Sequence, residues 1–303
     1  MRYYVGIDGG GTKTAFICYS EKNERICEFT LSSCHVLQVE EEKAIQILVN
    51  GLKKICVHAN VNGNDEVYIC AGLAGYGKNK EIRKRIEKIC ETSFKGYSYI
   101  IKNDAEVALE GALDGENGIL LIAGTGSIAL AKCNDKYYRC GGWGYQIGDE
   151  GSAYWIAKRL LQEYSMQCDG RKPRTALVSY LKEKCNINAD YDMIAYISNV
   201  LENKRDKIAN LAIYVYELAK QEDCAAIAIY EEAAEYLYKM ICALKSNFSE
   251  DILISYAGGV WKADRYILDP LKKLCDKKIK IIDPLHEPMY GAYLIARNTF
   301  EEK

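Results

Sequence analysis

The sequence opens with a short apolar stretch that leads directly into a carboxylate and a glycine-rich turn. Residues 3–7 are Tyr-Tyr-Val-Gly-Ile, and residues 8–14 are Asp-Gly-Gly-Gly-Thr-Lys-Thr. Glycines let backbone N–H groups approach an anion closely, and a nearby carboxylate can hold the metal ion that accompanies a phosphate. The pattern therefore indicates phosphate chemistry, although an ordinary glycine-rich hairpin turn explains a single such run equally well.

This turn fits neither of two common phosphate-binding motifs. Residues 6–13 approach the Walker A pattern, but they end in Gly-Thr-Lys where that motif has Gly-Lys-Ser/Thr. The dinucleotide fingerprint also fails, because Gly9 and Gly11 are followed by Thr14 in place of a third glycine. Both motifs open a helix, whereas residues 14–19 are β-branched and aromatic and predict a returning strand. We therefore expect the glycine turn of a β-hairpin.

Length and composition describe an ordinary globular protein. The 303 residues are enough for about two domains, and 49% hydrophobic with 27% charged residues is a typical balance. The net charge of -2 gives no reason to expect a nucleic acid or an anionic membrane as partner, so a small molecule is expected. The longest uncharged apolar run, residues 118–131, is too short to span a bilayer.

The thirteen cysteines include no Cys-x-x-Cys pair, and we expect no signal sequence ahead of the first strand. This usage predicts a reduced, cytoplasmic chain with mostly buried free thiols. A zinc or iron–sulfur site is left open but disfavoured, because Cys133 and Cys140 are seven residues apart in a predicted hairpin.

The opening pattern recurs in the middle of the chain. Residues 118–123 are a second apolar strand, which runs into Gly-Thr-Gly-Ser at 124–127 and then into strand-like residues 128–133. A polar turn and a third short strand follow at 134–140, as they do at 21–31 in the first copy. Two matching hairpin units imply a duplicated fold.

The remaining patterns complete two similar halves. Each half is predicted as β-β-β-α-β-α-β-α, a mixed sheet flanked by helices, with extra helices over residues 152–220. Further expected elements are helices at 40–58, 80–91, 104–113, 225–246 and 287–298, and strands at 67–71, 97–101, 252–256 and 279–282. The expected lobes are residues 1–115 and 116–303, with the last helix free to return to the first lobe.

Three glycine signatures now stand in order, at residues 8–12, 123–127 and 257–260. They resemble those of the sugar kinase, Hsp70 and actin superfamily, whose first two turns clasp the ATP phosphates and whose third supports the adenosine. Residues 141–155 (Gly-Gly-Trp-Gly-Tyr-Gln-Ile-Gly-Asp-Glu-Gly-Ser-Ala-Tyr-Trp) resemble the N-acetylglucosamine kinase branch and the related BadF/BadG-type ATPases. The resemblance covers almost the whole chain and implies an α/β, actin-like ATPase (ribonuclease H-like) fold, with two duplicated lobes around a nucleotide cleft.

The same resemblance implies ATP and Mg²⁺ as cofactors. Asp8 corresponds to the acid that holds Mg²⁺, through water, because Mg²⁺ gives up its hydration reluctantly. Lys13 adds charge near the phosphates or is simply an exposed hairpin lysine. The residues implied to bind ATP are Gly10, Gly11, Thr12, Lys13, Gly124, Thr125, Gly126, Gly258 and Gly259.

Asp104 follows a predicted strand and opens a predicted helix. Aspartate is a favoured N-cap residue, so capping is one explanation for it. Its counterpart in sugar kinases is the general base that faces the acceptor hydroxyl, and we favour that role. Asp104 is therefore the expected catalytic residue.

A hexose has polar edges and an apolar face, so small residues allow close approach while carboxylates accept hydroxyl protons. The residues implied to bind the sugar are Cys34, His35, Gly72, Asp104, Gly126, Ser127, Gly142, Trp143, Gly144 and Asp149. As alternatives, Trp143 packs in the core and Asp149 caps the helix that starts near Ser152.

One departure from the family lies at residues 32–35, Ser-Ser-Cys-His, where N-acetylglucosamine kinases typically have Ser-Thr-Asn-His. Asparagine offers a donor and an acceptor to sugar hydroxyls, whereas Cys34 is a weak partner for either. A less polar pocket would suit a larger substituent, such as the lactyl ether of N-acetylmuramic acid.

The leading prediction is a cytoplasmic, ATP-dependent kinase that phosphorylates the 6-hydroxyl of N-acetylglucosamine, N-acetylmuramic acid or both. The alternative is an ATPase that activates 2-hydroxyacyl-CoA dehydratase, which the many cysteines favour. Residues 140–143, Cys-Gly-Gly-Trp, depart from the Cys-Gly-Gly-Gln-Asp type loop of those activators. A non-catalytic nucleotide switch is disfavoured because Asp8, Asp104 and Asp149 are all present, and a homodimer is left open.

Overall fold

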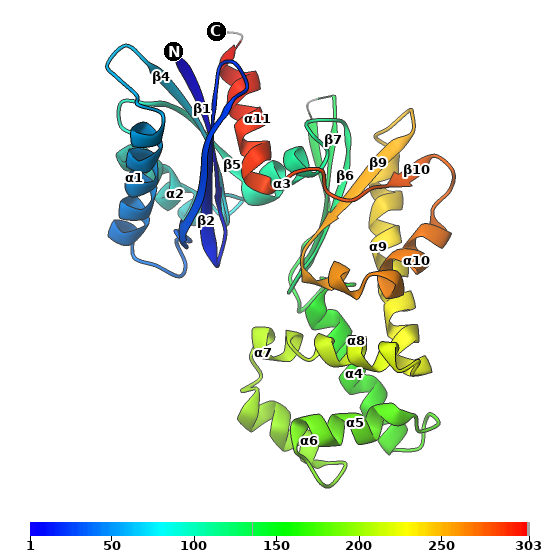
Figure 1. Cartoon of the computed structure of the whole chain (residues 1–303). Helices are drawn as coiled ribbons and strands as arrows, with labels where there is room; N and C mark the ends of the chain where they lie inside the picture. The colour runs from blue at the N-terminus through cyan, green and yellow to red at the C-terminus, as the bar shows by residue number, and fades with distance from the viewer. Residues whose placement is uncertain (135, 302–303) are drawn as a thin grey trace. The chain divides into compact units, whose positions relative to one another are not determined.

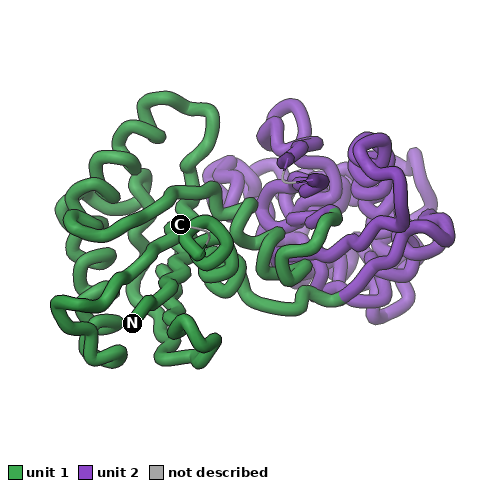
Figure 2. The backbone as a smooth tube through the Cα atoms, turned by 90° about the horizontal axis from the view of Figure 1, so that it is seen from above, with its two compact units in different colours: residues 1–118, 283–303 green, residues 119–282 purple. Residues whose placement is uncertain are grey.

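The computed structural model describes residues 1–134 and 136–301, and the chain divides into two compact units. Residues 1–118 and 283–303 form the first unit, and residues 119–282 form the second (Figure 2). The C-terminal segment therefore belongs to the unit that contains the start of the chain.

A five-stranded mixed sheet, in the order β3-β2-β1-β4-β5, forms the centre of the first unit. Its strands are β1 (Arg2–Gly9), β2 (Lys13–Ser20), β3 (Arg25–Ser32), β4 (Glu66–Leu73) and β5 (Ser98–Asn103). Its helices are α1 (Glu41–His58), α2 (Lys80–Ser93), α3 (Asp104–Ala112) and α11 (Pro288–Glu301). Side chains of β1 alternate between two cores: Val5 and Ile7 pack in the cluster with α1 and α2, whereas Tyr4 packs with α11. Helices thus cover both faces of the sheet (Figure 1).

The second unit repeats this arrangement around a sheet in the order β10-β9-β6-β7-β8. Its strands are β6 (Gly118–Ala123), β7 (Ser127–Cys133), β8 (Lys136–Gly141), β9 (Ile252–Ala257) and β10 (Ile279–Ile281). Counted from β8, this order matches that of the first sheet strand for strand. The pairs β2–β3 and β7–β8 are antiparallel, and the pairs β4–β5 and β9–β10 are parallel. The predicted two-lobed, duplicated α/β fold is confirmed.

Helices make up the rest of the second unit. They are α4 (Ala153–Cys168), α5 (Ala176–Cys185), α6 (Asp192–Ala195), the π-helical turn η1 (Tyr196–Val200), α7 (Arg205–Ala209), α8 (Ala212–Lys220), α9 (Cys224–Lys245), the 3-10 turn η2 (Gly259–Ala263) and α10 (Arg265–Leu274). We call residues 176–220 the helical insertion. Its apolar side chains, among them Leu181 and Val215, join one core with Leu160 of α4. Helix α7 packs against α4, which places the insertion beside the loop that precedes α4.

Glycines allow α11 to lie directly on β1 and α3. A Cβ added at Gly6 of β1 would lie 2.1 Å from the Met289 carbonyl oxygen, and one added at Gly291 of α11 would lie 2.0 Å from the Val107 carbonyl oxygen. Both obstacles are backbone atoms, which cannot move aside as the end of a side chain can. These contacts tie together the strand that ends in the first glycine turn and the helix that begins at Asp104.

We expect Gly291→Ala to lower the free energy of unfolding by at least about 2 kcal/mol, because overpacking against backbone outweighs the better helix propensity of alanine. Urea unfolding followed by circular dichroism measures the change. Gly63→Ala is the control, since a Cβ there meets nothing within 4 Å. Equal stability of the two variants would contradict the close packing of α11.

All thirteen cysteines are free thiols, and Cys224 and Cys242 are the exposed ones. No helix in residues 1–134 and 136–301 combines the length and the apolar character that a membrane span needs.

Candidate active site

The carboxyl ends of three parallel strands meet at one edge of the first sheet. In the strand register Asp8 of β1 lies beside Gly72 of β4, and Leu73 lies beside Asn103 of β5. Asp104 follows Asn103 as the first residue of α3. A Cβ at Gly72 would lie 2.2 Å from a methyl group of Val107, so this glycine lets α3 pack closely on β4. The sheet therefore brings the predicted metal ligand and the predicted base to the same edge.

Asp8 and Asp104 interact electrostatically there. Burial and then the charge of Asp104 raise the pKa of Asp8 to about 7, while Lys13 opposes the shift. Burial also raises the pKa of Asp104, against the backbone N–H groups at the helix start and the charge of His35. Two partly buried carboxylates of like charge favour a cation beside them.

This donor set fits Mg²⁺. The ion prefers hard oxygen ligands and in phosphoryl-transfer sites is usually held by one or two carboxylates, with water and phosphate oxygens completing the shell. In the described part of the chain, no group of three or more His, Cys, Asp or Glu side chains is placed to hold a metal ion. Asp8 remains the residue predicted to hold Mg²⁺, which would neutralise charge on the ATP phosphates.

The N-cap of α3 is Asn103, whose Oδ1 accepts a hydrogen bond from the Ala105 N–H at 3.0 Å. Asp104 is the first helical residue, and its own Oδ1 accepts from the same N–H at 3.0 Å. The sequence offered capping as an alternative role for Asp104, but the N-cap position belongs to its neighbour.

Cys34 contacts the strands on either side of the glycine turn, and His35 follows it in the chain. His35 is close enough to Asp104 to lower its pKa, and the Nδ1 of His35 accepts a hydrogen bond from the Leu37 N–H at 3.2 Å. The Cys34 thiol is buried, and a Cβ added at Gly9 would lie 2.9 Å from its Sγ. Burial raises the pKa of this thiol. Cys34 thus packs as an apolar residue, and its predicted sugar contact stays a prediction.

The first glycine turn is a hairpin turn, as its sequence predicts. Strands β1 and β2 pair antiparallel on either side of it, and the Gly10 N–H donates to the Lys13 carbonyl at 3.1 Å. Gly11, Thr12 and Lys13 are exposed. Their polar groups are therefore accessible to an anion.

Two further glycine signatures meet in the second unit. The turn after β6 is closed by a 2.9 Å hydrogen bond from the Gly124 N–H to the Gly126 carbonyl, and Thr125 is exposed. Gly258 follows the neighbouring strand β9 with φ +106°, and a Cβ there would lie 2.4 Å from the Ala123 carbonyl oxygen. The Gly258–Gly259 signature therefore lies directly against the turn at residues 124–126.

The hydroxyl of Ser127, predicted to bind the sugar, is buried and already hydrogen-bonded within the protein. The side chain is buried, and its hydroxyl donates to the Glu150 carbonyl at 2.6 Å. This bond ties the residue after the second glycine turn to Glu150, which directly follows the loop of residues 142–149.

That loop presents an exposed indole beside a buried carboxylate. Trp143 is 73% exposed, so the alternative that it packs in the core is wrong. It stands between Gly142 and Gly144, which have φ +68° and +91° and so occupy the left-handed region that suits glycine. Asp149 is 3% exposed and also has a positive φ of 60°.

Asp149 is held at both carboxylate oxygens. Its Oδ1 accepts from the Gly144 N–H at 3.1 Å, and its Oδ2 accepts from Nη2 of Arg205 at 2.7 Å. The N-cap of α4 is Ser152, which accepts from the Trp155 N–H. The alternative role of Asp149 as the helix cap is therefore wrong.

Sequence reasoning missed two charged residues near these sets. Arg205 begins the five-residue helix α7, where no motif or periodicity marks it. Glu287 precedes α11 and raises the pKa of Asp8 electrostatically. Both come close to the predicted residues only through tertiary packing, so a single sequence carries no signal for them.

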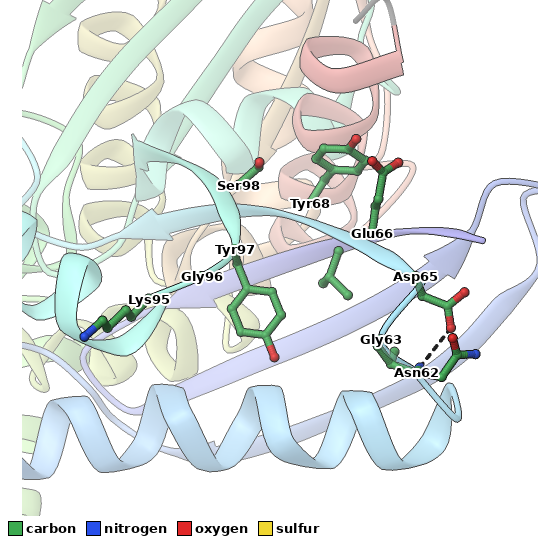
Figure 3. A pocket seen from close by; sticks show the side chains of 11 residues that line it. Asn62, Gly63, Asp65, Glu66, Tyr68, Lys95, Gly96, Tyr97 and Ser98 are labelled. Atoms are coloured by element: carbon green, nitrogen blue, oxygen red, sulfur yellow. Dashed lines mark hydrogen bonds between the residues drawn. The ribbon is translucent and has the colours of Figure 1, made fainter.

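The predicted residues thus form one set in each unit. The first unit holds Asp8, Gly10, Gly11, Thr12, Lys13, Cys34, His35, Gly72 and Asp104, and the second holds Gly124, Thr125, Gly126, Ser127, Gly142, Trp143, Gly144, Asp149, Gly258 and Gly259. None of them lines the cavity of about 470 Å³ drawn in Figure 3. That cavity lies where β4 and β5 begin, at the edge opposite Asp8, beside Glu66 and Ser98.

Comparison with known proteins gives a consistent result. The chain is 29% identical to an N-acetylmuramic acid/N-acetylglucosamine kinase of Clostridium acetobutylicum, over 98% of this chain and 99% of that protein. It is 30% identical to an N-acetyl-D-glucosamine kinase of Dictyostelium discoideum, over 98% of each. The solved structure of a proposed N-acetylglucosamine kinase from Chromobacterium violaceum matches with a TM-score of 0.75 and 25% identity, over 98% of this chain and 99% of that one.

The model of one family matches residues 5–296, a span that contains all the glycine signatures and all three acids described above. With this match, the chain belongs to the BadF/BadG/BcrA/BcrD ATPase family.

Proposed function

We propose that the protein is an ATP-dependent kinase that transfers the γ-phosphate to the 6-hydroxyl of an N-acetylated amino sugar, N-acetylglucosamine, N-acetylmuramic acid or both. The kinase relatives support a sugar as acceptor. The observation that carries the proposal is that Asp8 and Asp104 lie at the same edge of the first sheet. Phosphoryl transfer needs a cation site next to an oriented base.

In this proposal Asp104 accepts the proton of the sugar hydroxyl. The hydroxyl oxygen forms a bond to the γ-phosphorus, the bond from that phosphorus to the bridging oxygen breaks, and ADP leaves. The raised pKa of Asp104 makes its carboxylate a better proton acceptor than an exposed one, provided that it is ionised. Its position at the first residue of α3, held by the packing of α11, fixes the direction of the carboxylate.

The other predicted residues take supporting roles. The exposed hydroxyls of Thr12 and Thr125 and the neighbouring backbone N–H groups would donate to phosphate oxygens. The Gly258–Gly259 turn would support the adenosine. For the sugar, the exposed indole of Trp143 offers a surface for the apolar face of the ring, and the oxygens of Asp149 can accept from hydroxyls.

The direct test is a coupled assay of ADP release over glucose, glucosamine, N-acetylglucosamine, N-acetylmannosamine and N-acetylmuramic acid. We expect release with one or both of N-acetylglucosamine and N-acetylmuramic acid, and NMR of the product should show the phosphate at position 6. If ADP is released at the same rate with and without sugar, the kinase proposal fails.

The alternative of a dehydratase-activating ATPase makes a different prediction. Such a protein would be brown and would contain stoichiometric iron, whereas the kinase would not. Iron analysis and an absorption spectrum of anaerobically purified protein separate the two functions.

We place the kinase in the cytoplasm, where free thiols stay reduced. Size-exclusion chromatography of the purified protein tests whether it forms a homodimer.

A further inference from the structure

We propose that Arg205 is a positioning residue for sugar binding, which acts by holding the carboxylate of Asp149. This inference rests on the proposed kinase function. It concerns the second unit alone, where the glycine turn after β6 and the loop of residues 142–149 both contact one guanidinium.

The first contact is the ion pair itself. Nη2 of Arg205 donates to Oδ2 of Asp149 at 2.7 Å, and the Asp149 side chain is 4% exposed. Since the Gly144 N–H holds the other oxygen, the carboxylate is fixed at both ends. Asp149 also has a left-handed backbone, which aspartate adopts more readily than most residues when its side chain makes local hydrogen bonds, as it does here to the Gly144 N–H.

The second contact is with the glycine turn after β6. A Cβ added at Gly126 would lie 2.5 Å from Nη2 of Arg205 and 2.7 Å from Oδ2 of Asp149. The absence of a side chain at Gly126 is therefore what leaves room for the ion pair. The turn predicted to bind phosphate and the carboxylate predicted to bind sugar share one arginine as a neighbour.

The third contact is with the loop of residues 142–149. The guanidinium of Arg205 lies over the ring of Tyr145, 5.2 Å from the ring centroid. Tyr145 stands two residues after Trp143 in this loop. Because α7 belongs to the helical insertion, Arg205 ties that insertion to the loop that presents Trp143 and Asp149. A planar guanidinium can stack on a ring and donate to a carboxylate together, which a lysine ammonium does less well.

One nitrogen of the Arg205 guanidinium makes no hydrogen bond in this arrangement of the described residues. Its Nε is buried, and it has no hydrogen-bond partner among the residues that the structure describes. Leaving a buried donor unpaired costs free energy, so the arginine is not placed here to optimise its own hydrogen bonds. The arrangement is better explained by what it does for Asp149, and it assigns Arg205 a role in substrate binding.

The test compares four variants in the sugar kinase assay: Arg205→Met, Arg205→Lys, Asp149→Asn and the double variant Asp149→Asn/Arg205→Met. We expect Arg205→Met to raise KM for the sugar at least about tenfold, because the buried Asp149 loses its partner, and to leave KM for ATP within about threefold. Arg205→Lys should restore part of the sugar affinity. In Asp149→Asn protein, the further change Arg205→Met should have little effect, because the arginine acts through that carboxylate.

A matched control lies in the same unit. Arg159 pairs with Glu232 at 2.6 Å, its guanidinium lies 5.7 Å from the Trp155 ring centroid, and its side chain is 34% exposed against 36% for Arg205. Arg159→Met removes an arginine–carboxylate pair of like geometry whose acid, Glu232, is 32% exposed, and it should leave both KM values unchanged.

Two results would overturn the inference: an unchanged sugar KM in folded Arg205→Met, or effects of Arg205→Met and Asp149→Asn that add. Should Arg205→Met fail to fold, Arg205→Gln decides, since glutamine removes the charge that pairs with Asp149, and a sugar KM equal to that of the wild type would then refute the positioning role. Failure of the proposed function looks different, because the wild-type protein would then release ADP no faster with any sugar than without one.

Discussion

Asp104→Asn is expected to lower kcat at least about 100-fold while the fold and ATP binding are retained. Loss of a general base typically costs about 10² to 10⁴ in rate. Asparagine has the size of aspartate but cannot accept the hydroxyl proton. Because Asn103 caps α3, the substitution leaves the helix start intact, and it removes the repulsion between Asp104 and Asp8. Coupled ADP release measures kcat, and calorimetry measures ATP affinity.

Glu106→Gln is the matched control for this variant. Glu106 lies in the same first turn of α3 and pairs with Lys102 at 3.4 Å, so the change also removes one acidic charge there. We expect its kcat to stay within about twofold of the wild type. A nearly wild-type kcat in Asp104→Asn, or an equal loss in both variants, would exclude Asp104 as the base.

Much of the fold could be predicted because local patterns and tertiary structure agree. The β-branched and aromatic residues 14–19 predicted a strand after the first glycine turn, and β2 spans Lys13–Ser20. The repeat at residues 118–140 predicted a second hairpin unit, and the two sheets share one strand order. Period and turn chemistry are local properties, so the sequence shows them directly.

The candidate site was less predictable because its details depend on contacts between distant residues. Asn103 and Asp104 are both good capping residues, and only the structure shows which of them is the cap. Arg205 reaches Asp149 across 56 positions of sequence, from a helix too short to show a pattern. Trp143 and Asp149 each had an ordinary structural explanation that burial and hydrogen bonding then excluded. The residue types in the sequence suggested phosphate and sugar chemistry, whereas the hydrogen-bond partners and burial of each side chain depend on tertiary packing.

The raised pKa of Asp8 predicts a conflict between stability and function. An acid whose pKa is higher in the folded protein binds its proton more tightly there than in the unfolded chain, so folding loses stability as pH rises from about 4 to about 7. Asp8→Asn removes this loss. We therefore expect the variant to be more stable than the wild type at pH 8, by about 2–4 kcal/mol in metal-free buffer, with a difference that shrinks toward pH 5.

The same variant should lose at least about 100-fold in kcat, because the neutral amide of an asparagine cannot hold Mg²⁺ as a carboxylate does. Urea unfolding at pH 5, 6, 7 and 8 with EDTA measures the first effect, and the coupled assay measures the second. Glu66→Gln, at the other end of the parallel strands, controls for the loss of one exposed acid. A stability difference that does not vary with pH would show that Asp8 titrates normally. Gain of stability with loss of activity would instead mean that the fold tolerates a repulsive carboxylate pair because phosphoryl transfer requires it.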